Sequence, residues 1–106
     1  MLRPVYLFTD FTIHGPYVGQ LHARIIAEDA ALRVIDLMHD APACDPRASA
    51  YLLAALAGQF DAETLFIGVV DPGVGTQRGA VALQADGQWF VGPDNGLFAV
   101  AAAWAG

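Results

Sequence analysis

Residues 64–78 of the chain read TLFIGVVDPGVGTQR. The apolar run at the start of this stretch predicts a buried strand, and Asp71 follows it directly. The closely spaced Gly73 and Gly75 then predict a backbone that turns sharply and lets a ligand or another loop approach closely. Arg78 adds a permanent positive charge. An acid, a tight turn and a cation at the mouth of a sheet predict a functional site.

Strand and helix patterns alternate through the first seventy residues. The apolar runs that predict strands and the helical spacings that predict helices follow in the order strand 5–9, helix 16–30, strand 32–38, helix 46–59 and strand 64–70. Asp45 is a good N-cap for the second helix, and Pro46 suits its first turn. This βαβαβ order predicts an α/β fold with a mostly parallel sheet and helices on both faces.

A β-hairpin is predicted after the third strand. Residues 80–85 and 88–92 read as strands on either side of Asp86-Gly87, a dipeptide that favours hairpin turns. A turn at 93–96 leads into a short apolar helix over 97–104. The chain reads as one domain over 1–106, and because its last helix has no polar cap we expect it to be a partial domain.

Composition excludes several classes of protein. Hydrophobic residues make up 56% of the 106 residues and charged residues 15%, so either helices cover both faces of the sheet or apolar surface packs against another chain or segment. Five Lys plus Arg and a net charge of −6 give no basic stripe for nucleic acid. No apolar run is long enough for a membrane span, and no signal peptide is evident. A single cysteine forms no internal disulfide, so a cytoplasmic protein is expected.

Polar side chains gather at the predicted carboxyl ends of the strands. Asp10 ends the first strand, His39-Asp40 the second and Asp71 the third, and Asp94-Asn95 follows the fifth. In open parallel sheets ligands bind beyond these ends. One such Asp alone would be read as a helix cap, but four polar strand ends together favour a ligand site.

The glycine pair does not form a dinucleotide-binding motif, since Gly79 leads into another strand and not into a helix. Arg78 near Asp71 could form a structural ion pair, or it could hold a catalytic carboxylate ionised and oriented.

The remaining reactive or aromatic residues have simpler interpretations. The histidines have no zinc-motif spacing, so no metal site is predicted; His22 is expected to be a solvated helix residue, and His39 to lie near the rim. Cys44 is expected to be a small buried side chain, and Trp89 and Trp104 to belong to the core or to an interface.

Five motifs give the chain a specific resemblance. They are Thr9-Asp10-Phe11, Pro16-Tyr17-Val18-Gly19, Ile35-Asp36-Leu37-Met38-His39, residues 70–78 and residues 91–96. Over nearly its whole length the chain resembles the N-terminal domain of the S-adenosylmethionine hydroxide adenosyltransferases, the group that also contains the fluorinase and chlorinase enzymes.

The resemblance implies a reaction and a set of roles. Water or hydroxide attacks C5′ of the S-adenosylmethionine ribose, and adenosine and L-methionine are the products. No cofactor is implied. Asp71 and Arg78 would be the catalytic residues. Asp10 and Phe11 would bind substrate, with Asp10 on the ribose hydroxyls, and Asp94 and Asn95 would line the ligand site.

The resemblance also implies partners outside this chain. Family members are usually trimers, in which each site lies between this domain and a small C-terminal β-barrel domain of the next subunit. That barrel, and the segment with the family's catalytic histidine, are absent from 1–106.

The chain departs from the family's motifs at two positions. Gly15 stands where the family usually has Asp, and Thr12 stands where Gly is common.

Two alternatives stay open. The chain could be a non-catalytic module that binds an adenosyl ligand or only oligomerises, or its parent could be an S-adenosylmethionine-dependent halogenase.

Overall fold

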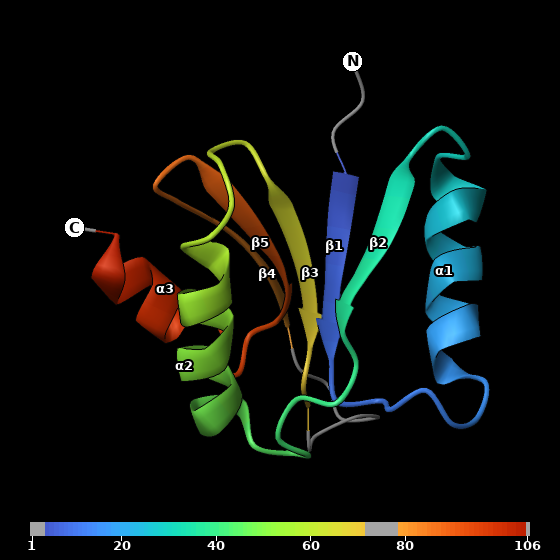
Figure 1. Ribbon diagram of the computed structural model, residues 1–106, viewed down its shortest axis with the longest axis horizontal. Coiled ribbons are helices and arrows are strands. Elements are labelled where there is room, and N and C mark those ends of the chain that lie inside the picture. Colours follow the sequence, from blue (N-terminus) through green and yellow to red (C-terminus); the bar gives the residue numbers. More distant parts are fainter. Residues whose placement is uncertain (1–3, 72–78, 106) are drawn as a thin grey trace.

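Strands and helices alternate in the order that the sequence predicts. The structure is a computed structural model, and it describes residues 4–71 and 79–105. The elements are β1 (Pro4–Thr9), α1 (Tyr17–Glu28), β2 (Arg33–Met38), α2 (Pro46–Ala57), β3 (Leu65–Val69), β4 (Ala80–Ala85), β5 (Gln88–Pro93) and α3 (Ala99–Trp104) (Figure 1). Most of the predicted element ends differ from the observed ends by one or two residues.

The strands form one mostly parallel sheet. Its order is β2-β1-β3-β5-β4, and only the β4–β5 pair is antiparallel. The predicted hairpin is confirmed. Its turn residues Asp86 and Gly87 have φ of 52° and 78°, the left-handed conformation that a two-residue hairpin turn of this kind requires.

Helices cover both faces of the sheet, as predicted. The first crossover leaves β1 for β2 at the sheet's edge, and the second returns from β2 past β1 to β3. Right-handed crossovers that run in opposite directions place their helices on opposite faces. α2 and α3 therefore share one face, where they lie side by side, and α1 covers the other (Figure 1).

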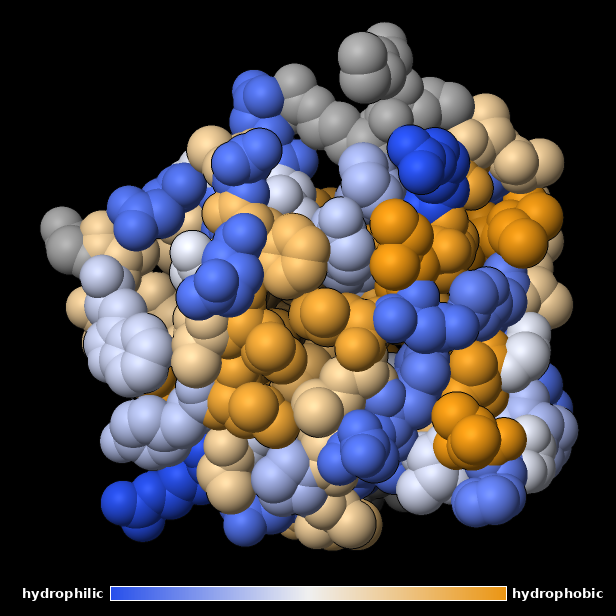
Figure 2. Space-filling model, viewed as in Figure 1, coloured by the Kyte–Doolittle hydropathy of each residue, from blue (hydrophilic) through white to orange (hydrophobic). Residues whose placement is uncertain are grey.

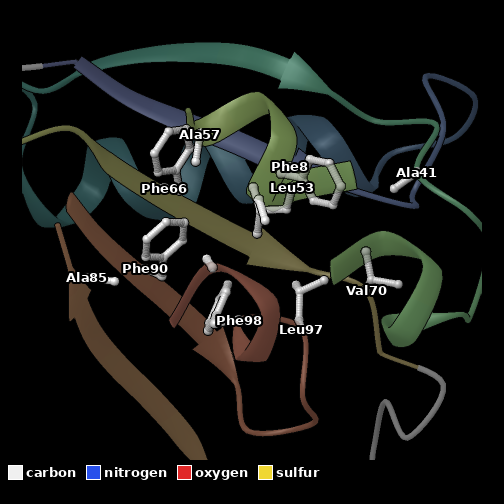
Figure 3. Close-up of a cluster of buried hydrophobic side chains, with 12 residues drawn as sticks. Phe8, Ala41, Leu53, Ala57, Phe66, Val70, Ala85, Phe90, Leu97 and Phe98 are labelled. Atoms are coloured by element: carbon white, nitrogen blue, oxygen red, sulfur yellow. The ribbon is translucent and has the colours of Figure 1, made fainter. Parts of the chain in front are cut away.

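The main core lies between the sheet and the α2–α3 pair. Phe8, Phe66 and Phe90 come from three adjacent strands, and the rings of Phe66 and Phe90 stack with centroids 5.2 Å apart. Leu53 of α2 is completely buried against them (Figure 3). Ala101 adds a small side chain from α3. Asp45 caps α2 as predicted, accepting a hydrogen bond from the N–H of Ala48 at 3.0 Å.

Two glycines let the strands approach closely below α3. A Cβ at Gly92 would collide with the carbonyl oxygen of Gly68 on the neighbouring strand, and a Cβ at Gly68 would lie 2.8 Å from Leu97. The sheet and the segment after β5 therefore pack without room for a methyl group at either position.

Both tryptophans lie at the surface. Trp89 and Trp104 are 43% and 60% exposed, so neither belongs to the core of the described chain, and an interface role stays a prediction.

Figure 2 shows apolar side chains gathered in the middle of one face, between α2 and α1. Among the described residues, no helix has the length and apolarity needed to cross a bilayer.

Candidate functional site

An open pocket of about 580 Å³ lies at the carboxyl ends of the parallel strands. Its lining residues are Asp10, Phe11, Tyr17, Ala43, Cys44, Val69 and Asp71. Three residues that the sequence predicts as site residues, Asp10, Phe11 and Asp71, therefore meet in one pocket. They come together because β1 pairs in parallel with β3, which brings the ends of both strands to the same edge.

Asp10 is held by backbone contacts at the end of β1. Its Oδ2 accepts a hydrogen bond from the backbone N–H of Cys44 at 2.7 Å, and its own N–H approaches the carbonyl oxygen of Val69 at 3.4 Å. The prediction that Cys44 is buried is wrong. Cys44 has a φ of 53°, turns its N–H towards Asp10 and leaves its thiol exposed on the pocket wall.

Phe11 forms an aromatic wall together with Tyr17. The Phe11 N–H donates to the hydroxyl of Thr9 at 3.2 Å, which fixes the backbone directly after Asp10. The two rings lie with centroids 6.1 Å apart and an angle of 55° between them. In the sequence Tyr17 is only one of the apolar positions of a predicted helix, but its ring is 59% exposed and lines the pocket. An aromatic residue in the first turn after the polar loop was the available signal.

Asp71 is half-buried and lines the pocket as the first residue of the predicted catalytic segment. Arg78, Gly73 and Gly75 lie outside the described residues. The pairing of Asp71 with Arg78 and the close backbone approach at the glycines therefore stay predictions.

Asp94 and Asn95 are not among the residues that line the pocket. The side-chain amide of Asn95 donates to the carbonyl oxygen of Val70 at 2.7 Å, and its Oδ1 accepts from the N–H of Leu97 at 3.2 Å. Asp94 is exposed, and its backbone N–H donates to Gly79 at 2.9 Å. Asn95 thus supports the strand end that carries Asp71, a role that its place in the sequence does not reveal.

A second polar cluster lies next to β1 and joins three elements. His22 of α1 and His39, just after β2, each place Nε2 at 2.7 Å from the same oxygen, Oδ1 of Asp36. His39 is buried, and its Nδ1 lies 2.6 Å from the hydroxyl of Thr9. The prediction that His22 is a solvated helix residue is wrong, because its side chain is only 28% exposed and bonded to Asp36.

The two imidazoles lower the pKa of the Asp36 carboxyl. Partial desolvation raises the pKa of its carboxyl, but the hydrogen bonds and positive charge of His39 and His22 outweigh that effect and leave the pKa below its ordinary value. The ionised form of Asp36 therefore persists to lower pH than that of an ordinary aspartate.

A family model covers almost the whole chain. The family model described as "SAM hydroxide adenosyltransferase N-terminal domain" matches residues 5–105. The chain belongs to this family. The S-adenosylmethionine hydroxide adenosyltransferase resemblance drawn from the five motifs is thereby confirmed.

Relatives of known name are similar to most of this chain. A Thermus thermophilus protein named (R)-S-adenosyl-L-methionine hydrolase is 44% identical over 94% of the chain, and a Salinispora tropica protein of the same name is 41% identical over 90%. A Methanocaldococcus jannaschii protein of that name is 32% identical over 92%. The chain spans only 36–39% of the length of these three relatives.

Solved structures show the same fold. A conserved hypothetical protein from Thermus thermophilus is 43% identical and superposes with a TM-score of 0.81 over 97% of this chain and 42% of its own. An uncharacterized conserved protein from Thermotoga maritima is 33% identical, with a TM-score of 0.87 over 94% of this chain and 38% of its own. The α/β fold of this domain is thus shared with both solved structures.

Proposed function

We propose that this domain supplies the nucleoside-binding half of an S-adenosylmethionine hydrolase. The observation that carries the proposal is the meeting of Asp10, Phe11 and Asp71 in one pocket at the strand ends. A relative that is 44% identical over 94% of this chain is named (R)-S-adenosyl-L-methionine hydrolase. Because the chain spans well under half of those relatives, the activity is assigned to the longer protein that carries this domain.

Asp10 binds the ribose in this proposal. A carboxylate accepts hydrogen bonds from both vicinal hydroxyls of a ribose, and the bond from Cys44 N–H holds the Asp10 carboxyl at the pocket wall. Phe11 and Tyr17 offer aromatic surface beside it, against which a flat adenine base can pack. The acidic rim attracts the positive sulfonium of the substrate.

Asp71 orients the attacking water. The new bond joins the water oxygen to C5′, the C5′–S bond breaks with its electron pair staying on the sulfur of methionine, and the Asp71 carboxylate accepts the proton that the water loses. Such a displacement needs an in-line nucleophile shielded from bulk water. Arg78 would orient the Asp71 carboxylate through charge-assisted hydrogen bonds. Asp94 and Asn95 would complete the ligand site from the loop after β5, with Asn95 acting through Val70.

Assembly and location remain predictions of the same proposal. The parent is expected to form the family's trimer, in which a second subunit closes the pocket, and light scattering on the full-length protein measures this directly. A cytoplasmic location stays a prediction from the composition.

Chromatographic detection of adenosine and L-methionine, released from S-adenosylmethionine by the full-length protein, tests the function. Asp71→Asn should lower kcat by about 100-fold or more, the usual size of a positioned acid–base contribution. Undiminished turnover in that variant would remove Asp71 from the mechanism. A 5′-halogenated nucleoside formed only when chloride or fluoride is added would indicate the halogenase instead. Binding of S-adenosylmethionine without any product would indicate the non-catalytic module.

A further inference from the structure

The His22, Asp36 and His39 cluster has the composition of a metal site. The three donor atoms, two imidazole nitrogens and one carboxylate oxygen, lie within 4.8 Å of one another. Two histidines with one carboxylate are a common protein ligand set for Zn²⁺ and for other first-row divalent metals. The sequence contains no zinc motif because one ligand comes from α1 and two from around β2, so only the fold assembles the set.

Small movements would convert the hydrogen bonds into metal bonds. With zinc–ligand bonds of about 2.0–2.2 Å in tetrahedral geometry, neighbouring donor atoms are roughly 3.3 Å apart. The two N–O distances of 2.7 Å would open by roughly 0.6 Å, and the two nitrogens would close by at most roughly 1.5 Å from the 4.8 Å limit. Side-chain rotation of His22, which is on the exposed side of the cluster, can supply such a shift.

Thr9 provides the supporting contact that a ligating histidine requires. Its completely buried hydroxyl lies 2.6 Å from Nδ1 of His39. A hydroxyl can donate to Nδ1 while Nε2–H bonds Asp36, and it can accept from Nδ1–H once Nε2 binds a metal. The ring orientation is therefore held in both states, as in metal sites where the second ring nitrogen is fixed by a neighbour.

The geometry points to a site for one Zn²⁺ ion, held by His22, Asp36 and His39, with the remaining coordination position open to water. Asp36 and His22 have side chains that are 48% and 28% exposed, so an ion can enter from solvent. Nitrogen donors favour Zn²⁺ over Mg²⁺, which prefers an all-oxygen octahedron. This site is distinct from the pocket that contains Asp10 and Asp71, and it needs no part of the proposed hydrolase activity.

The bound ion would fasten α1 to the sheet. No side chain of α1 is fully buried. Among the side-chain contacts that the structure describes, the bond between His22 and Asp36 is the one polar connection of α1 to β2. A metal that binds only the folded arrangement stabilises the fold by mass action.

Zinc titration of the untagged 106-residue chain tests the site. Cys44→Ser removes the exposed thiol as a competing ligand, and a chromophoric chelator reports free Zn²⁺. We expect one Zn²⁺ per chain, no competition from excess Mg²⁺ and a higher Tm with Zn²⁺ present. His22→Ala and Asp36→Asn should each weaken binding at least about tenfold, by comparison with the effect of lost supporting residues in known sites.

His14→Ala is the matched control, because His14 is an exposed histidine outside the cluster and should leave zinc affinity unchanged. Far-ultraviolet circular dichroism shows that each variant is folded, and His22→Ala is the decisive one because its side chain is partly exposed. The proposal is overturned if zinc does not bind saturably, or if His22→Ala binds it as tightly as the parent chain does. Co²⁺ substitution gives a second readout, since intense visible d–d bands that vanish in His22→Ala report direct ligation.

Discussion

The side-chain amide of Asn95 donates a hydrogen bond to the carbonyl oxygen of Val70 at 2.7 Å, one residue before Asp71. This bond joins the loop after β5 to the end of β3. Asn95 also accepts from the N–H of Leu97, so its amide is engaged at both ends. The position of the proposed catalytic carboxylate thus depends on a residue that is not itself part of the pocket wall.

Asn95→Ala should lower the free energy of unfolding by about 1–3 kcal/mol, because it leaves two partly buried backbone groups without their partner. Urea denaturation of the 106-residue chain measures this change. Asp94→Ala is the neighbouring control. Its side chain is exposed, so its effect should stay within about 0.5 kcal/mol, and equal losses in both variants would contradict the role given to Asn95.

Gly92→Ala should destabilise the fold by more than about 3 kcal/mol, since the new methyl group meets a backbone carbonyl that cannot move aside. Gly19→Ala is a matched change in the opposite direction. Gly19 lies inside α1 with open space around it, and there alanine should stabilise by about 1 kcal/mol. Thermal unfolding of both variants provides the comparison, and a tolerated Gly92→Ala would rule out the close strand approach.

Thr12→Gly should stabilise the chain by up to about 1 kcal/mol. Thr12 is β-branched and has a φ of 61°, a conformation that costs about 1–2 kcal/mol. Glycine removes this strain, but the larger backbone entropy that it loses on folding cancels about 0.5–1 kcal/mol of the gain. Gly15→Ala should do the reverse, because Gly15 has a φ of 80°. Chemical denaturation that gives the same sign for both variants would contradict the loop conformation.

Asp10→Asn should raise KM for S-adenosylmethionine by about 10- to 100-fold in the full-length protein, as expected for hydrogen bonds to a charged group worth about 1.5–3 kcal/mol. The amide oxygen can still accept from Cys44 N–H, so the loop keeps its anchor. Asp86→Asn makes the same chemical change in the hairpin turn and should leave KM unchanged. An unaltered KM in Asp10→Asn would exclude the ribose contact.

In metal-free chain, the stability that Asp36 contributes should disappear in acid. Its pKa is lower in the folded state than in the unfolded state, so its contribution is fully present above the ordinary value of 3.8 and is lost as the pH falls through the lowered value. The groups that face it among the described residues are His22 from α1 and His39 after β2. Urea denaturation in the presence of EDTA measures the unfolding midpoints of the parent chain and of Asp36→Asn. The two midpoints should converge below about pH 3.8. A constant difference across this range would exclude the linkage.

Local signals explain how much of the fold the sequence predicts. Apolar runs, the Asp45 cap and the Asp86-Gly87 turn each act within a few residues, so they located every strand and helix. The parallel order then predicted that Asp10 and Asp71 share one edge of the sheet.

The contacts that sequence reasoning missed are long-range or depend on backbone conformation. His22 and Asp36 are 14 residues apart and meet only through the crossover of α1 onto β2. Cys44 is apolar enough to predict burial, but its positive φ and its N–H bond to Asp10 turn the thiol outward. Periodicity alone contains neither kind of information.

The weak attachment of α1 has a consequence for exchange and for recognition. A helix without fully buried side chains is the segment that detaches first in sub-global opening, so its amides should exchange with deuterium faster than those of β1 and β3. Tyr17, the first residue of that helix, also lines the pocket that contains Asp10 and Asp71. Whenever the helix lifts, the pocket loses that side chain, and a ligand that packs against Tyr17 would protect amides along all of α1.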